Sequence, residues 1–118
     1  MISIFAGNVS HVQFKPGVDG EVDDAGKVTV EPVKDEFVPA GTPLAVGPVF
    51  AIKSLDYFAY QDLFLGDASQ ADKVRKAFEV ALVDIDNDKD KLKLFRESPS
   101  ARIAPALFNA IYEASAGN

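Results

Sequence analysis

The sequence predicts a single α+β domain, with a β-rich part over residues 1–53 and a helical part over residues 54–118. Three observations lead to this prediction. Short alternating apolar runs, separated by glycine and proline turns, fill the first part and are typical of strands and hairpins. After Ser54 the apolar residues recur at helical spacing, which indicates about three helices. The length of 118 residues suits one domain.

Four short apolar runs in the N-terminal part are predicted as strands. They cover residues 2–4, 9–15, 27–31 and 49–52. Val12 and Phe14 share one face of the second run, and Val28 and Val30 are expected to point inward from the third. Turns are expected at the glycine and proline positions that separate these runs.

The rest of the N-terminal part carries weaker strand signals. Residues 18–26 are acidic and have little to bury, so they are predicted to form a mobile loop. Proline then recurs, which favours edge strands or loops, because proline has no N–H to donate to a β-ladder. These prolines are Pro32, Pro39, Pro43 and Pro48.

The first two helices are predicted from their start signals and apolar spacing. Ser54 is a suitable N-cap for a helix over residues 55–65, and Gly66 is a suitable stop. A second helix is expected to begin at Ser69 and to continue as an amphipathic helix through residue 88. Its apolar stripe is formed by Val74, Phe78, Ala81, Leu82 and Ile85.

A third helix is predicted near the C-terminus. It is expected to begin at Ser98 and Pro99, or to restart at Pro105, because proline is well tolerated in the first turn of a helix. Gly117 is expected to end it. Its apolar stripe is formed by Ile103, Leu107, Ala110, Ile111 and Ala114.

Composition excludes several classes of function. A net charge of −6 disfavours nucleic acid or an anionic membrane as the main partner. The absence of cysteine rules out disulfides and thiolate chemistry. The N-terminus does not resemble a signal peptide, and no apolar run is long enough to span a membrane. The only histidine, His11, lies in a predicted strand without a nucleophile motif, so we expect no enzyme and no cofactor.

Residues 86–97, DNDKDKLKLFRE, have acidic residues at positions one, three, five and twelve, as in a calcium-binding EF-hand loop. The sixth position, where the backbone turns sharply, is Lys91 instead of glycine, and the eighth is Lys93. These lysines would repel a divalent cation. We therefore expect no metal site, and interpret the segment as the charged end of the second helix and a linker.

The segment 54–65, SLDYFAYQDLFL, is the most informative of the predicted helices, because only Asp56, Gln61 and Asp62 are plainly polar. One side carries Leu55, Phe58, Ala59 and Leu65, and a second row carries Tyr57, Tyr60 and Phe64. Two hypotheses are open. The helix is either a central core helix covered on both sides, or its aromatic row is exposed and binds a partner protein. The candidate partner-binding residues are Tyr57, Tyr60, Phe64, Phe108 and Tyr112.

Three segments resemble the small tail assembly chaperones of long-tailed bacteriophages. They are PVFAIKSL at 48–55, VRKAFEVALVDIDND at 74–88 and PALFNAIYEASAGN at 105–118. The first matches the family pattern F-x-I/L-x-x-L ahead of a helix. The last matches an L-x-x-x-I-x-x-x-S ending through Leu107, Ile111 and Ser115.

The resemblance implies a non-enzymatic protein in the host cytoplasm. Such chaperones bind the long tape-measure protein, keep it soluble and help to recruit tube subunits. The alternative is a structural virion subunit, a head–tail joining or tail component, that assembles into a ring or tube. Its proline-rich strands and acidic segment would then act as interlocking arms, and self-association is expected.

Overall fold

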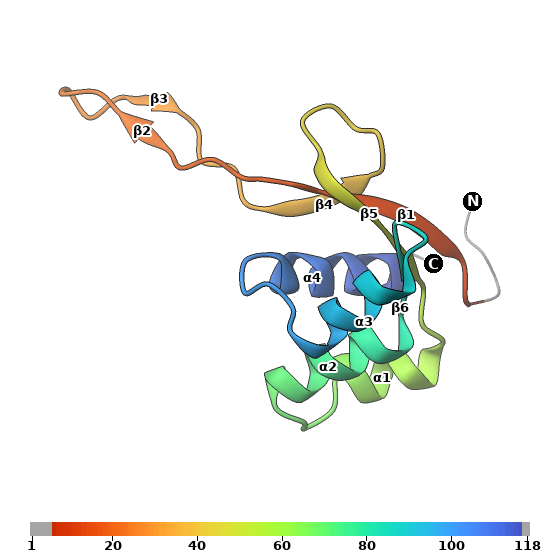
Figure 1. The fold of residues 1–118 in the computed structure, drawn as a ribbon. Helices are drawn as coiled ribbons and strands as arrows, with labels where there is room; N and C mark the ends of the chain where they lie inside the picture. The colour runs from red at the N-terminus through yellow and green to blue at the C-terminus, as the bar shows by residue number, and fades with distance from the viewer. Residues whose placement is uncertain (1–5, 117–118) are drawn as a thin grey trace.

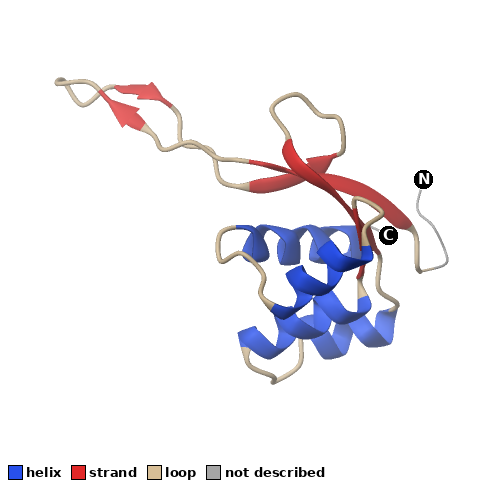
Figure 2. Ribbon diagram, viewed as in Figure 1, coloured by secondary structure: helices blue, strands red, loops and turns tan. Residues whose placement is uncertain are grey.

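An antiparallel sheet and four helices make up the body of the computed structural model, which describes residues 6–116 (Figures 1 and 2). The four-stranded sheet has the order β4-β1-β5-β6. Its strands are β1 (Val9–Lys15), β4 (Glu36–Pro39), β5 (Val46–Lys53) and β6 (Leu82–Ile85). The helices are α1 (Tyr57–Phe64), α2 (Gln70–Val80), α3 (Lys89–Glu97) and α4 (Ile103–Ala116). The predicted α+β class is confirmed.

The core lies between the sheet and the helices. Its largest fully buried side chains are Phe50, Ile52, Phe78, Leu82, Leu107 and Ile111. Phe50 on β5 is central, because its ring contacts Phe37 of β4 and Phe95 of α3 with centroid separations of 5.1 and 5.3 Å. Phe95 in turn contacts Phe78 of α2 at 5.4 Å. These edge-on and tilted contacts tie the sheet to two helices.

A second, two-stranded sheet projects from one end of the body (Figure 1). It is formed by β2 (Glu21–Val22) and β3 (Val28–Val30). Reciprocal hydrogen bonds of 2.8 and 2.9 Å between Val18 and Val33 extend this pairing towards the body. We call residues 18–33 the arm. The arm gives the molecule an elongated shape, 51 × 33 × 31 Å.

Two predictions for the arm were wrong. The acidic segment 18–26 was expected to be a loop, but it contains β2 and the turn of a hairpin. Asp23 closes this turn by accepting hydrogen bonds of 2.9 Å from the N–H groups of Ala25 and Lys27. Val28 and Val30 were expected to point inward, yet they are 47% and 36% exposed, because nothing in the structure covers the hairpin.

The predicted second helix was also wrong beyond residue 80. Helix α2 ends at Val80, and Leu82–Ile85 forms the strand β6 beside β5. The predicted stripe residues Leu82 and Ile85 are still buried, but strand geometry buries them. The segment from Val80 onward is rich in β-branched residues, and pairing with β5 outweighs its helical spacing.

Residues 86–97 form a separate helix where a helix end and a linker were predicted. Asp86 and Asn87 adopt left-handed conformations, with φ of 54° and 56°, and so separate β6 from α3. Asp88 caps α3 by accepting hydrogen bonds from the N–H groups of Asp90 and Lys91, at 2.9 and 3.3 Å. Residues 6–116 therefore contain four helices, where about three were predicted.

The boundaries of the first and last helices differ slightly from prediction. Asp56, not Ser54, is the N-cap of α1, and it accepts a 2.8 Å hydrogen bond from the Ala59 N–H. Ser54 is buried, and its hydroxyl accepts hydrogen bonds from the N–H groups of Gly7 and Asn8. Pro105 lies in the first turn of α4, where proline is tolerated because no N–H is needed there for a helical hydrogen bond. The predicted strand at 2–4 and the stop at Gly117 lie outside the described residues.

Substitution of Phe50 tests the central position of its ring. Phe50→Ala is expected to lower the free energy of unfolding by about 3–5 kcal/mol, because it leaves a cavity where three elements meet. Phe58→Ala, a matched change at a ring that is 77% exposed, is expected to change it by less than about 0.5 kcal/mol. Urea unfolding measures both values, and equal effects would contradict this description of the core.

Candidate functional site

Four of the five predicted partner-binding residues come together where α1 and α4 meet. The ring of Phe64 lies 5.1 Å from that of Phe108 and 5.0 Å from that of Tyr112, measured between centroids. Tyr60 lies 5.3 Å from Phe64 and stacks on Tyr112 at 5.8 Å. Hydrogen bonding between the two tyrosine hydroxyls raises the pKa of Tyr60 above its ordinary value.

The fifth residue, Tyr57, extends this row along α1. It lies three residues before Tyr60, one turn earlier on the helix. Its ring contacts Phe58 at 5.7 Å, and the two side chains are 68% and 77% exposed. We call Tyr57, Tyr60, Phe64, Phe108 and Tyr112 the aromatic face. Tyr60, Phe64 and Phe108 are half-buried in it, whereas Tyr57 and Tyr112 are exposed.

The two sides of α1 differ in exposure. Leu55 and Leu63 are buried, so this side faces the core. Ser115 of α4 helps to hold the start of α1, since its hydroxyl accepts a 3.0 Å hydrogen bond from the Leu55 N–H. Phe58 and Leu65, which were predicted to share a side with Leu55, are 77% and 63% exposed. Helical spacing alone does not distinguish these residues from Leu63.

The two helices that form the aromatic face carry only acidic charged residues, Asp62 on α1 and Glu113 on α4. Neither α1 nor α4 contains lysine or arginine. The acidic residues in and next to these helices are Asp56, Asp62, Asp67 and Glu113. The face therefore combines partly exposed aromatic rings with acidic side chains on the same two helices, which favours a partner with apolar and basic side chains.

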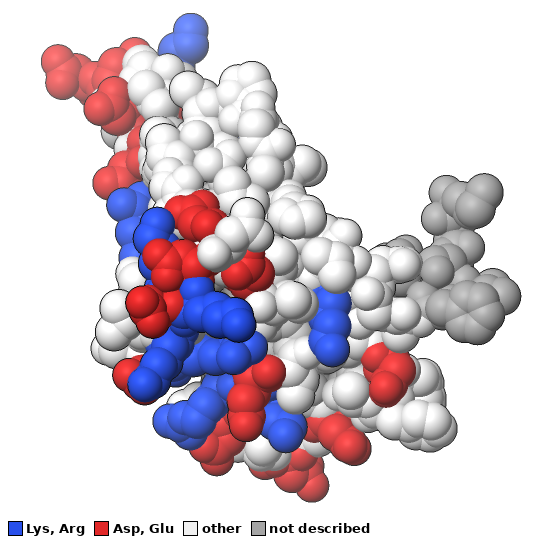
Figure 3. Space-filling model, turned by 45° about the vertical axis from the view of Figure 1, so that its right-hand side comes forward, with Lys and Arg blue, Asp and Glu red and all other residues white. Residues whose placement is uncertain are grey.

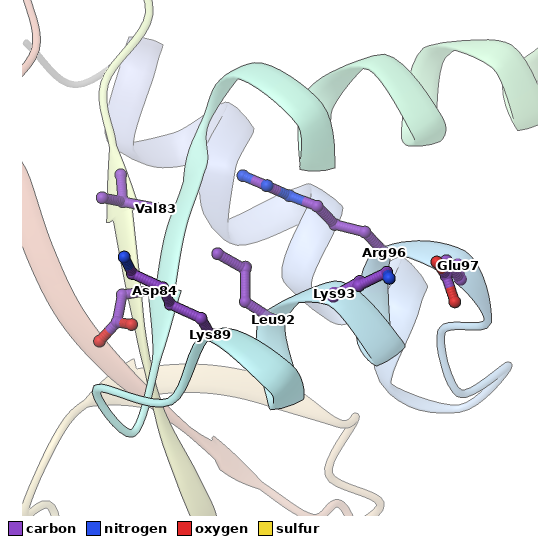
Figure 4. Close-up of a pocket in the computed structure, with 7 residues that line it drawn as sticks. All are labelled: Val83, Asp84, Lys89, Leu92, Lys93, Arg96 and Glu97. Atoms are coloured by element: carbon purple, nitrogen blue, oxygen red, sulfur yellow. The ribbon is translucent and has the colours of Figure 1, made fainter.

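A groove of about 550 Å³ lies between β6 and α3 (Figure 4), and no sequence pattern predicted it. Its lining residues are Val83, Asp84, Lys89, Leu92, Lys93, Arg96 and Glu97. Arg96 is fixed in place, because its guanidinium donates hydrogen bonds to the backbone oxygens of Phe78 and Leu82. Lys89 and Lys93 are exposed. The groove appears only once residues 82–85 form a strand and 89–97 a helix.

Asp86 and Asp88, the first two acidic residues of segment 86–97, take part in local contacts. The Asp86 carboxylate accepts a 2.7 Å hydrogen bond from the Val49 N–H and forms a 3.0 Å ion pair with Lys91. The backbone hydrogen bond, and then the lysine, lower the pKa of Asp86. Among residues 6–116, no group of three His, Cys, Asp or Glu side chains is placed to hold a metal ion. His11 is exposed on β1.

An ion pair joins the base of the arm to the start of α4. The Asp35 carboxylate binds the Arg102 guanidinium through two hydrogen bonds of 2.9 and 3.0 Å. It also accepts a 2.7 Å hydrogen bond from the Gly17 N–H. The Arg102 hydrogen bond, followed by that from Gly17, lowers the pKa of Asp35 to about 2. Arg102 also lies 5.5 Å from the centre of the Phe14 ring.

No protein-family model matches the chain, and neither a curated protein nor a solved structure shows significant similarity to it. In the part of the chain that the structure describes, no helix is both long and apolar enough to cross a membrane.

Acid should weaken the ion pair at the base of the arm. Because the pKa of Asp35 is lowered to about 2, its ionised form stabilises the fold above the unfolded-state pKa of about 4. This stabilisation is lost as the pH falls from about 4 towards 2. Wild type should therefore be more stable than Asp35→Asn near neutral pH, and the difference should shrink over that range.

Urea unfolding of both proteins at several pH values measures this difference. Asp62→Asn, at an exposed acid on α1, is the matched control and should follow wild type at every pH. If the difference in free energy of unfolding between wild type and Asp35→Asn stayed constant down to about pH 2, the ionised Asp35 carboxylate would not be the source of that difference.

Proposed function

We propose that this protein is a non-enzymatic bacteriophage tail assembly chaperone that binds the tape-measure protein through the aromatic face. The observation that carries the proposal is the row of partly exposed aromatic rings on α1 and α4, two helices without a basic residue. The resemblance of three segments to that family supplies the viral context. The site of action is then the host cytoplasm.

The arrangement of the rings favours an amphipathic helix as the bound element. Tyr57, Tyr60 and Phe64 follow one another along α1 at spacings of three and four residues, and Phe108 and Tyr112 do so along α4. Two neighbouring helices with such rows form a surface on which the apolar stripe of a third helix packs. The acidic residues of these two helices favour a bound helix with basic residues beside that stripe.

A chaperone function follows from covering such stripes. A long helical protein that exposes apolar stripes before assembly is prone to aggregate, and transient cover keeps it in solution. A face built on few residues binds weakly enough to release its partner when the tube subunits arrive. The exposed rings of Tyr57 and Tyr112, with that of Phe58 next to Tyr57, supply the apolar contact. The half-buried rings of Tyr60 and Phe64 pack against each other and keep the surface rigid.

A second candidate is a structural subunit of the virion, such as a head–tail joining or tail component. The projecting arm favours it, because hairpins that extend beyond the body of a subunit reach neighbouring subunits in an assembly. A structural subunit would remain in the finished particle, whereas a chaperone would be absent from it.

Substitution of the exposed rings tests the proposed binding surface. Tyr57→Gln together with Phe58→Gln should weaken binding of the tape-measure protein about 30-fold or more, the loss expected when an aromatic hot spot worth about 2 kcal/mol is removed. The fold should persist, since both side chains are mostly exposed. Co-expression with the tape-measure protein of the same phage, followed by sedimentation, measures how much of it stays soluble.

Leu44→Asn is the matched control for exposed apolar area. Leu44 is 79% exposed and has φ of 72°, a conformation that asparagine tolerates better than leucine. This variant should bind as wild type does. Circular dichroism checks that each variant is folded. A folded Tyr57→Gln/Phe58→Gln protein that keeps the tape-measure protein soluble would refute the proposed surface.

A further inference from the structure

We infer that the arm of one molecule docks into the groove between β6 and α3 of a second copy of this chain. The contact is head-to-tail, since arm and groove are different surfaces of the same molecule. Three features of the structure support it: the uncovered apolar residues of the arm, its negative charge, and the basic rim of the groove. The inference uses no residue of the aromatic face, so it stands separately from helix binding.

The arm is a two-stranded hairpin whose apolar side chains are largely uncovered. Two-stranded hairpins are marginally stable in water unless they pack against another element. All five valines of the arm are at least 36% exposed, and Val22 reaches 65%. They are Val18, Val22, Val28, Val30 and Val33. A partner that covers these side chains would stabilise the hairpin as well as bind it.

The arm is also strongly acidic. It contains five acidic residues and one lysine. The acidic residues are Asp19, Glu21, Asp23, Asp24 and Glu31. Figure 3 shows acidic side chains gathered on the projecting end of the molecule and basic side chains clustered, among some acidic ones, over the body. A surface that covers the arm should therefore offer both apolar and basic side chains.

The groove between β6 and α3 offers that combination. Helix α3 carries four basic and two acidic residues. Val83, which is 44% exposed, and the half-buried Leu92 are the apolar residues of its lining (Figure 4). Lys89 and Lys93 are exposed in the groove lining and available for acidic side chains. Arg96 is fixed by its hydrogen bonds to the backbone, so the positive charge in the groove is preorganised.

A molecule cannot fill its own groove in this structure. The arm leaves one end of the sheet and points away from the helices (Figure 1). The Asp35–Arg102 ion pair and the 2.7 Å Gly17 hydrogen bond fix its base against α4. One arm and one groove per molecule allow the contact to repeat, which gives rings if the rotation closes and filaments if it does not. A repeating contact of this kind is what a structural virion subunit, the second candidate function, would use to assemble.

Paired charge reversals test the contact. The arm variant is Glu21→Lys with Asp24→Lys, which spares the turn-closing Asp23. The groove variant is Lys89→Glu with Lys93→Glu, which spares Arg96 and Lys91. The control is Lys53→Glu with Lys76→Glu, an equal change of charge at two exposed lysines outside the groove. Light scattering on a sizing column, at low salt and over a range of protein concentration, gives the mass of each.

Wild type and the control should form oligomers whose mass grows with concentration and falls in roughly 0.5 M sodium chloride, where screening is strong. Each charge-reversed variant alone should stay monomeric. An equimolar mixture of the two should associate again, because the basic arm of one matches the acidic groove of the other, and the remaining pair is the wild-type contact.

Three results would overturn the inference. They are a monomeric wild type at every concentration, an unchanged mass in both variants, and a mixture that does not associate. Helix binding is measured separately on the monomeric variants, whose aromatic face is intact. If they still bind the tape-measure protein, failure of the docking contact leaves the proposed function in place.

Discussion

Strand β5 is hydrogen-bonded to a neighbouring strand on each of its two edges, and most of the molecule is arranged around this pairing. Phe50, Ala51 and Ile52 are consecutive and buried, whereas Val46, Gly47 and Lys53 towards the strand ends are exposed. β1 pairs with one edge, and β6 supplies the other. To place β6 there, the chain ends α2 at Val80 and starts α3 after the left-handed pair at 86 and 87. The groove beside α3 exists because of this arrangement.

Local sequence patterns were sufficient to predict the elements whose apolar spacing fits only one type of secondary structure. The apolar run at 49–52 and the stripe of Ile103, Leu107 and Ile111 both describe the structure correctly. The pattern at 81–85 was ambiguous, because its apolar residues suit a helix as well as an alternating strand. The free edge of β5 decided between them, and this edge is visible only in the tertiary structure.

The candidate site was predictable in part for the same reason. The aromatic residues of α1 and α4 are conspicuous in the sequence, and four of them meet in the structure. Exposure of Phe58 and burial of Leu63 depend on where α1 meets its neighbours, which helical spacing does not encode. The acidic segment 18–26 was interpreted as a loop because it has little to bury, and in the structure its two valines, Val18 and Val22, are exposed. That same lack of cover makes the arm a candidate for contact with another molecule.

The aromatic face gives the protein an intrinsic optical signal. The chain has three tyrosines and no tryptophan, and all three tyrosines, Tyr57, Tyr60 and Tyr112, belong to that face. Tyrosine fluorescence therefore comes entirely from the aromatic face. A ligand that covers the face is therefore expected to change the tyrosine fluorescence. A change that separates the two helices should do the same, and neither measurement needs an added label.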